Sequence, residues 1–132
     1  MSPTNLDVVR GYLAALQRFA APDELAAFFT DDVVMNELPN RLVPSGRTRS
    51  RDELLSASTQ APKVLAEQRY VIRRELELGD TVALDVDWSA TLKVPLSQTP
   101  AGGKLNARIS MWARLRDGRI CEQTNFDCYQ PF

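Results

Sequence analysis

The stretch RISMWARLRDGRI, residues 108–120, decides the fold class because it reads as two strands joined by a tight turn. Apolar and polar residues alternate through residues 104–116 and again through residues 119–129, which is typical of strands with two different faces. Asp117-Gly118 lies between these segments, and Asp-Gly is a strong signal for a two-residue hairpin turn. The C-terminal part of the chain is therefore predicted to contain an antiparallel hairpin.

Two further alternating segments precede this hairpin, at residues 70–78 and 81–94, and Gly79-Asp80 separates them. A stretch rich in proline and glycine, residues 95–103, connects the second segment to the third. The four segments together predict an antiparallel sheet of consecutive strands.

The first half of the sequence predicts helices. Apolar residues recur at helical spacing over residues 5–19, which indicates an amphipathic helix. The other expected elements are a short helix at 24–29, a strand at 33–37, a loop at 38–49, and a third helix that begins at the capping box of Ser50 and Glu53 and ends or bends near Pro62. Helices followed by an antiparallel sheet predict a single α+β domain over residues 1–132.

Composition excludes several classes of function. Sixteen Lys and Arg balance seventeen Asp and Glu, so no excess charge favours nucleic acid or an anionic membrane as partner. No uninterrupted apolar stretch approaches the ~18 residues of a membrane-spanning helix. The chain has no histidine, which removes Ser-His-Asp and Cys-His catalysis and most zinc and haem sites. Acid–base chemistry must come from Asp, Glu, Tyr, Lys or Cys.

The two cysteines predict free thiols. If Cys121 and Cys128 lie on one strand, a rise of about 3.3 Å per residue separates them by roughly 23 Å, whereas a disulfide needs Cα atoms within about 7 Å. Free thiols fit a reducing compartment. The first residues also lack the basic and apolar regions of a signal peptide, so a cytoplasmic location is expected.

The order of elements resembles the nuclear-transport-factor-2-like superfamily, which includes SnoaL-like polyketide cyclases, limonene epoxide hydrolase and ketosteroid isomerase. VVRGYLAALQR and ELAAFFTDDVVMNE are similar to the first helix of ketosteroid isomerase and to its segment leading into an acidic strand end, and RISMWARLRDGRI is similar to its last hairpin. The closing NFDCYQPF is similar to the tail of SnoaL-like proteins. The resemblance implies a conical, curved antiparallel sheet wrapped around N-terminal helices, a cystatin-like or nuclear-transport-factor-2-like barrel, with a pocket inside.

The resemblance also implies candidate catalytic residues. Glu37 falls at the position of the general base of ketosteroid isomerase, and Tyr12 falls at that of its oxyanion-hole tyrosine. Ser110 stands where that enzyme has a second donor, and Asn125 stands where SnoaL-like cyclases tend to place an Asp. Asp127, two residues on, could substitute for that Asp. The catalytic candidates are thus Glu37, Tyr12 and Asp127, and the substrate-binding candidates are Asn125, Ser110, Trp112, Arg108, Trp88 and Gln123.

Each candidate also has a purely structural interpretation. Glu37 could be a strand-end carboxylate in water, and Tyr12 could be a core tyrosine. Trp88 and Trp112 could fill a core or line a pocket for a flat hydrophobic ligand. A cavity-facing Arg108 is expected to pair with Asp127 or Glu37, because an unpaired buried guanidinium is costly.

Residues 104–116 pose a conflict between hydrophobicity and resemblance. If Arg108, Ser110 and Trp112 face the cavity, the apolar Ile109 and Met111 face outward. Such an apolar outer face would have to be covered, which predicts a homodimer.

The expected function is binding of a small hydrophobic or polycyclic molecule. The leading hypothesis is an isomerase, cyclase or dehydratase in which a carboxylate removes a proton next to a carbonyl. The resemblance implies neither a metal nor an organic cofactor. The alternative is a non-catalytic module of the same fold that binds a small molecule or mediates dimerisation.

Overall fold

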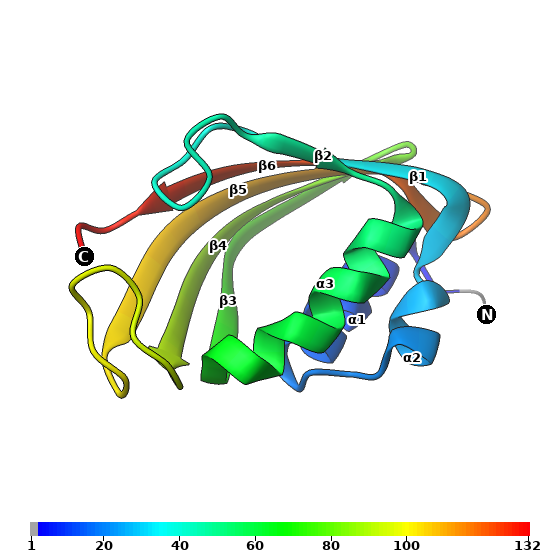
Figure 1. The fold of residues 1–132 in the computed structure, drawn as a ribbon. Helices are drawn as coiled ribbons and strands as arrows, with labels where there is room; N and C mark the ends of the chain where they lie inside the picture. Colours follow the sequence, from blue (N-terminus) through cyan, green and yellow to red (C-terminus); the bar gives the residue numbers. More distant parts are fainter. Residues whose placement is uncertain (1–2) are drawn as a thin grey trace.

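The chain folds as helices laid on the concave side of a curved sheet (Figure 1). The structure is a computed structural model that describes residues 3–132. Within that range no helix is long and apolar enough to cross a membrane. The elements are α1 (Asn5–Gln17), α2 (Pro22–Ala26), β1 (Phe29–Glu37), β2 (Arg47–Arg49), α3 (Arg51–Val64), β3 (Leu65–Leu78), β4 (Thr81–Leu92), β5 (Lys104–Arg116) and β6 (Arg119–Tyr129).

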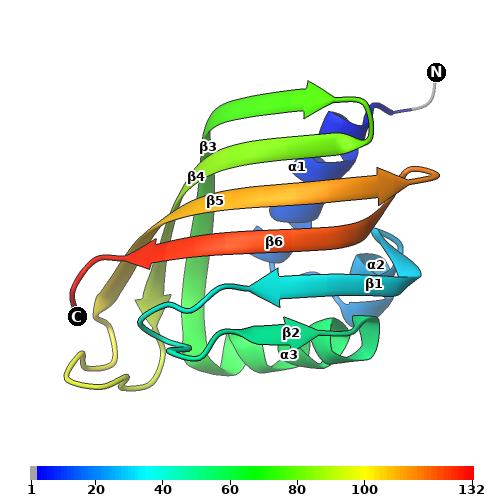
Figure 2. The ribbon, with the colours of Figure 1, turned by 90° about the horizontal axis from the view of Figure 1, so that it is seen from above.

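The sheet confirms the predicted α+β fold class with a curved sheet and N-terminal helices. Its strand order is β2-β1-β6-β5-β4-β3, and β3 to β6 form the expected antiparallel run of consecutive strands. One detail differs, because β1 pairs with β6 in parallel, so the sheet is mixed rather than wholly antiparallel. Figure 2 shows that β2 and β3 form the two free edges and leave the sheet open rather than closed as a barrel.

The helices differ in how deeply they pack. α1 buries Val9, Tyr12, Leu13 and Ala15 against the concave face of the sheet, and the capping box of Thr4 and Asp7 fixes its start. α3 has no fully buried residue. Its apolar side chains Leu54 and Leu55 pack at the margin of the core, so α3 covers the concave space only from the side.

Both ends of α3 agree with the prediction. Ser50 Oγ accepts the Glu53 N–H at 3.3 Å, and Glu53 Oε1 accepts the Ser50 N–H at 3.0 Å. The helix ends at Val64, two residues after Pro62. Pro62 lies in the last turn, where the hydrogen bond that a proline removes supports little further helix.

The loop predicted at residues 38–49 contains an unpredicted strand. β2 pairs antiparallel with the end of β1, with Arg47 opposite Glu37 and Arg49 opposite Met35. No apolar alternation marks β2, because it has only three residues, Arg-Thr-Arg, and none of them is apolar. Cys121 and Cys128 are free, as predicted.

The orientation of β5 corrects the expectation for Arg108, Ser110 and Trp112. Its residues alternate strictly between buried and exposed, and these three side chains lie on the exposed, convex face. The buried set is Leu105, Ala107, Ile109, Met111, Ala113 and Leu115. A strand can present only one of its two faces to the helices, and burying the apolar face is favoured. The apolar residues of β5 thus face inward, so the predicted apolar outer face of this strand is wrong and gives no support for a homodimer.

Candidate functional site

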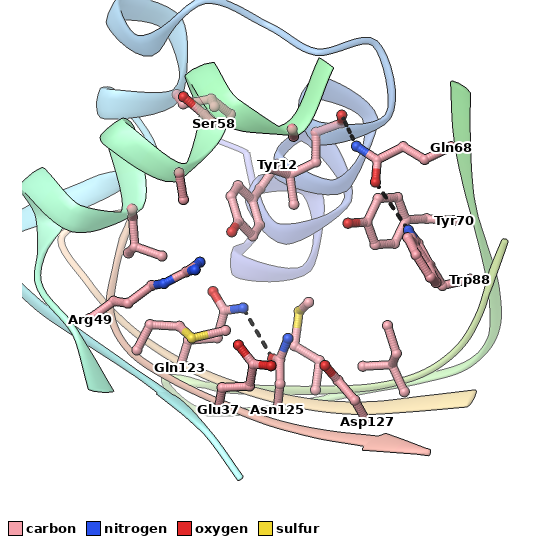
Figure 3. A pocket seen from close by; sticks show the side chains of 18 of the residues that line it. Tyr12, Glu37, Arg49, Ser58, Gln68, Tyr70, Trp88, Gln123, Asn125 and Asp127 are labelled. Atoms are coloured by element: carbon pink, nitrogen blue, oxygen red, sulfur yellow. Dashed lines mark hydrogen bonds between the residues drawn. The ribbon is translucent and has the colours of Figure 1, made fainter. Parts of the chain in front are cut away.

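A cavity of about 250 Å³ lies between the concave face of the sheet and helices α1 and α3 (Figure 3). Its wall combines apolar side chains with a limited set of polar ones, as in small-molecule sites. The polar and aromatic lining residues are Tyr12, Glu37, Arg47, Arg49, Ser58, Gln68, Tyr70, Trp88, Gln123, Asn125, Asp127 and Tyr129.

Six of the nine candidate residues line this cavity: Tyr12, Glu37, Trp88, Gln123, Asn125 and Asp127. Arg108, Ser110 and Trp112 do not, because they point from β5 to the opposite face of the sheet. Arg108 is paired, but with Asp85 on the neighbouring strand rather than with Asp127 or Glu37. Its Nε and Nη2 donate to the two carboxylate oxygens of Asp85 at 2.6 and 2.8 Å.

Glu37 is buried in the cavity wall with both carboxylate oxygens occupied. It ends β1, and its side chain is only 8% exposed. Arg47, directly opposite on β2, donates from Nε to Oε1 at 3.0 Å, and Asn40 donates from Nδ2 to Oε2 at 2.8 Å. The interpretation of Glu37 as a solvated strand end is therefore wrong. Each of its oxygens accepts one hydrogen bond from the protein.

Gly46 allows β2 to return close enough to β1 for this ion pair. Its φ is +66°, in the left-handed region that favours glycine. A Cβ added there would lie 2.7 Å from the carbonyl oxygen of Glu37. Glycine is thus needed both for the backbone angle and for the close approach of the two strands.

Asp127 differs from Glu37 in lacking a partner. Its Oδ1 is buried and has no hydrogen-bond partner among residues 3–132. Burial, and then the negative charge of Glu37, raise the pKa of Asp127 to about 6, while Arg47 opposes the shift. Asp127 therefore combines a free lone pair with a pKa closer to neutrality than that of an ordinary carboxyl group.

The hydroxyl of Tyr12 faces the same cavity from α1. Burial raises the pKa of Tyr12 to about 12, and the neighbouring amide of Gln123 and the positive charge of Arg49 partly offset that rise. Tyr12 therefore remains a neutral phenol at physiological pH and can donate a hydrogen bond. Beside it on β6, Gln123 Nε2 donates to Asn125 Oδ1 at 3.1 Å.

Trp88 and Gln68 serve mainly to build the wall. The indole Nε1 of Trp88 donates to Gln68 Oε1 at 3.0 Å, and Gln68 Nε2 donates to the Leu16 carbonyl oxygen at 2.7 Å. Because these polar atoms satisfy one another, the Trp88 ring presents an apolar surface. Tyr70 and Tyr129 stand nearby, and burial, together with the charge of Asp127 among other groups, raises the pKa of both phenols.

Six polar or aromatic lining residues were not among the candidates from the sequence: Arg47, Arg49, Ser58, Gln68, Tyr70 and Tyr129. The alternation that begins at Tyr70 could have flagged this tyrosine, because the inward residues of such a strand share one parity. Arg47 and Arg49 also lie two apart, just before a capping box, but the surrounding loop pattern concealed the strand that aligns them. Among residues 3–132 no group of three or more acidic or sulfur-bearing side chains could hold a metal ion.

The cavity thus has two polar regions. One contains Arg49, Tyr12 and Gln123 (Figure 3). The other contains Asp127, whose charge acts on Tyr70 and Tyr129. The first offers positive charge and hydrogen-bond donors. The second offers a carboxylate able to accept a proton. Such an arrangement can remove a proton from a bound molecule while stabilising negative charge elsewhere on it.

A model of the SnoaL-like domain matches residues 9–123 of this chain. Comparison with curated proteins gave no match. Among solved structures, IdmH from Streptomyces antibioticus, a candidate polyketide cyclase, superposes with a TM-score of 0.79 at 20% identity, covering 95% of this chain and 92% of that chain.

Two further structures show the same fold. An NTF2-like protein of unknown function from Burkholderia pseudomallei has a TM-score of 0.74 at 20% identity, covering 95% of this chain and 91% of that one. A SnoaL-like polyketide cyclase from Agrobacterium tumefaciens has a TM-score of 0.70 at 16% identity, covering 96% and 92%. At such identities the likeness shows a common fold and nothing of the reaction.

Proposed function

Since this chain belongs to the SnoaL-like domain family, we propose that its cavity binds a small hydrophobic molecule and catalyses proton transfer next to a carbonyl group. A cavity of about 250 Å³ is smaller than the roughly 300–1,000 Å³ of pockets for drug-sized ligands. A ligand of one or two rings suits that volume better than a larger polycyclic one.

Asp127 is the general base in this proposal. Its carboxylate takes a proton from the carbon beside the carbonyl, the electrons of the C–H bond form a carbon–carbon double bond, and the carbonyl oxygen becomes an enolate oxygen. The observation that carries the assignment is the buried, unpartnered Oδ1 of Asp127 in the cavity wall. A pKa near 6 leaves the carboxylate ionised at neutral pH yet basic enough to accept a proton.

Tyr12 stabilises the enolate. Its buried hydroxyl remains protonated because its pKa is about 12, so it can donate a hydrogen bond to the oxygen on which charge develops. Asn125 and Gln123 line the same part of the wall and orient the ligand. Trp88 supplies an apolar surface for its ring system.

Glu37 supports the reaction indirectly in this proposal. Each of its oxygens accepts one hydrogen bond, from Arg47 or from Asn40, which fixes the carboxylate in place, whereas Oδ1 of Asp127 has no partner among residues 3–132. Its negative charge nevertheless raises the pKa of Asp127. Glu37 is therefore a positioning residue that makes its neighbour a stronger base.

The enolate intermediate is common to the three reaction types that we consider. Protonated Asp127 can return the proton to another carbon, which is an isomerisation. Alternatively, the enolate carbon can attack a second carbonyl, which is a cyclisation, and the alkoxide formed takes the proton from Asp127. In a dehydration the enolate re-forms its carbonyl and expels a β-hydroxyl group, which takes the proton from Asp127 and leaves as water. Each outcome uses the same base and the same hydrogen-bond donor.

The proton-transfer step can be tested with indanone, a flat hydrophobic ketone. Proton NMR in deuterium oxide measures exchange at the carbon beside the carbonyl. We expect exchange faster than in buffer, with a rate that rises through pH about 6 as Asp127 ionises. Asp127→Asn should lower the rate by about 10²–10⁴-fold. Asp31→Asn, at an exposed position on β1, should leave it unchanged.

Retained exchange in Asp127→Asn would contradict the base assignment. Binding of indanone without any exchange would favour the second candidate function, a module that binds small molecules without catalysis. The ion pair of Glu37 with Arg47 favours that second candidate, because the residue matching the base of ketosteroid isomerase serves here to hold β2 against β1.

The proposal also includes a homodimer and a cytoplasmic location. Two large apolar side chains on the convex face, Trp112 and Phe126, are 50% and 46% exposed and lie on adjacent strands. A two-fold contact across this face would cover both. Two free cysteines fit a reducing compartment.

A further inference from the structure

Arg49 faces the cavity because of the register of the sheet edge. It lies directly opposite Met35 in the β1–β2 pair, and directly opposite residues point to the same face of a sheet. Met35 and Arg49 both line the cavity. Figure 3 shows the Arg49 side chain extending into the cavity from the side opposite the wall of Tyr70 and Trp88.

Arg49 differs from its neighbour Arg47 in having no direct ion-pair partner, although the negative charges of Glu37 and Glu53 lie close enough to act on its pKa and partly offset its lowering. Arg47 is paired with Glu37, whereas within residues 3–132 no ion pair or hydrogen bond engages the Arg49 side chain. The nearby acid Glu53 is engaged by the backbone of Ser50 as a helix cap. Burial, and then the charge of Arg47, lower the pKa of Arg49. A partly buried guanidinium without a partner is unfavourable, so its position calls for an anion from outside the chain.

We propose that Arg49 binds a carboxylate carried by the ligand. This inference rests on the proposed function, in which the cavity binds a small hydrophobic molecule, and it narrows the ligand class to hydrophobic carboxylic acids. The planar guanidinium matches a carboxylate through two parallel N–H···O bonds. Tyr12, whose hydroxyl is close enough to Arg49 for the two to interact, can donate a further hydrogen bond to the same group.

Other parts of the cavity disfavour the same anion. Glu37 and Asp127 carry negative charge, and Trp88 and Ile109 are apolar. A ligand carboxylate is therefore directed to Arg49, and the rings extend toward Tyr70 and Trp88 (Figure 3). In this orientation the body of the ligand passes Asp127.

The test compares two probes of the same shape, naphthoate and its neutral amide naphthamide, by isothermal titration calorimetry at pH 7. We expect the wild-type protein to bind naphthoate at least about tenfold more tightly, as charge-assisted hydrogen bonds imply. Arg49→Gln should remove that preference while retaining naphthamide binding, and Arg49→Lys should keep part of it. Arg114→Gln makes the same change of net charge on the convex face, where Arg114 pairs with Glu122, and should behave like wild type.

The possible results separate this inference from the proposed function. Equal affinity for both probes in the wild-type protein, or an unchanged preference in Arg49→Gln, would overturn the role of Arg49 while leaving a binding cavity. Binding of neither probe would overturn both proposals. A preference lost equally in Arg114→Gln would show that overall charge, not Arg49, attracts the carboxylate.

Discussion

The two carboxylates that line the cavity, Glu37 and Asp127, differ in their hydrogen-bond partners. Glu37 accepts hydrogen bonds from Arg47 and Asn40, whereas one oxygen of Asp127 is buried without a partner. The charge of Glu37 raises the pKa of Asp127 and the charge of Arg47 lowers it. The ion pair of Glu37 and Arg47 therefore adjusts the pKa of Asp127, the proposed base.

Variants of this ion pair should shift the pH dependence of indanone exchange in opposite directions. The wild-type rate is expected to rise through pH about 6. Glu37→Gln removes the negative charge that raises the pKa of Asp127, so the rise should move to lower pH. Arg47→Gln removes the opposing positive charge, so the rise should move to higher pH. NMR exchange rates measured from pH 4 to 9 decide between these outcomes, and shifts of the same sign in both variants would contradict the coupling.

The sequence could predict which residues meet in the cavity better than what each one does there. Resemblance placed Tyr12, Glu37 and Asp127 correctly, since their positions depend on element order. The pairing of Glu37 could not be predicted, because Arg47 comes from a segment without any strand pattern. The state of a carboxylate depends on such partners rather than on its own position in the sequence.

At the scale of elements, the β1–β2 hairpin delivers both arginines to the cavity, and Gly46 controls its geometry. Two glycines allow a matched comparison, since Gly46 and Gly118 both have positive φ. A Cβ at Gly118 meets nothing within 4 Å, whereas one at Gly46 meets the Glu37 carbonyl oxygen at 2.7 Å. Alanine at either position therefore has the same unfavourable backbone angle, but only alanine at position 46 also has a steric clash.

Gly118→Ala should lower the free energy of unfolding by about 1–2 kcal/mol, which is the cost of a left-handed backbone for alanine. Gly46→Ala should lower it further, and by displacing β2 it should also reduce the preference for naphthoate over naphthamide. Urea denaturation and calorimetry measure the two effects. Equal stability and an equal naphthoate preference in the two variants would show that β2 tolerates the displacement.

One strand, β5, was assigned the wrong faces and another, β2, was missed, and the apolar pattern of each strand explains the outcome. β5 carries an apolar and a polar set of residues in strict alternation, and hydrophobicity alone assigned its faces correctly. Resemblance favoured the opposite assignment for Arg108, Ser110 and Trp112. β2 was missed because its three residues pair at a sheet edge without burying apolar surface. Periodicity thus predicts the strands that build a core and misses the strand that does not.

At the scale of the whole molecule, the convex face combines charge with exposed aromatic surface. Asp85 and Asp87 form ion pairs there with Arg73 and Arg108. Trp112 lies opposite Thr124 in the β5–β6 pair, so Phe126 is its diagonal neighbour. The core order of helices and strands was predictable from pattern alone, but this outer surface depends on which face each strand turns outward.

We expect the protein to be a homodimer at micromolar concentration, with Trp112 in the interface. Light scattering should give twice the mass of one chain for the wild-type protein. Trp112→Glu should give a monomer, because it places an unpaired charge in the contact. Trp112→Phe, which keeps an aromatic ring, should remain dimeric. A wild-type protein that is monomeric throughout this range, or a dimeric Trp112→Glu, would exclude this face as the contact.

In the proposed binding mode the residue that selects a carboxylate, Arg49, lies at the sheet edge. None of the three residues of β2 is buried, and β2 has β1 as its neighbour on one side only. Asn40, Gly46 and Arg47 connect this edge to Glu37 and have to be kept. Libraries that vary residues 41–45 and Arg49 could therefore evolve new ligand preferences while the core stays the same. The varied residues and the core lie in separate segments, which makes this chain a good starting point for directed evolution.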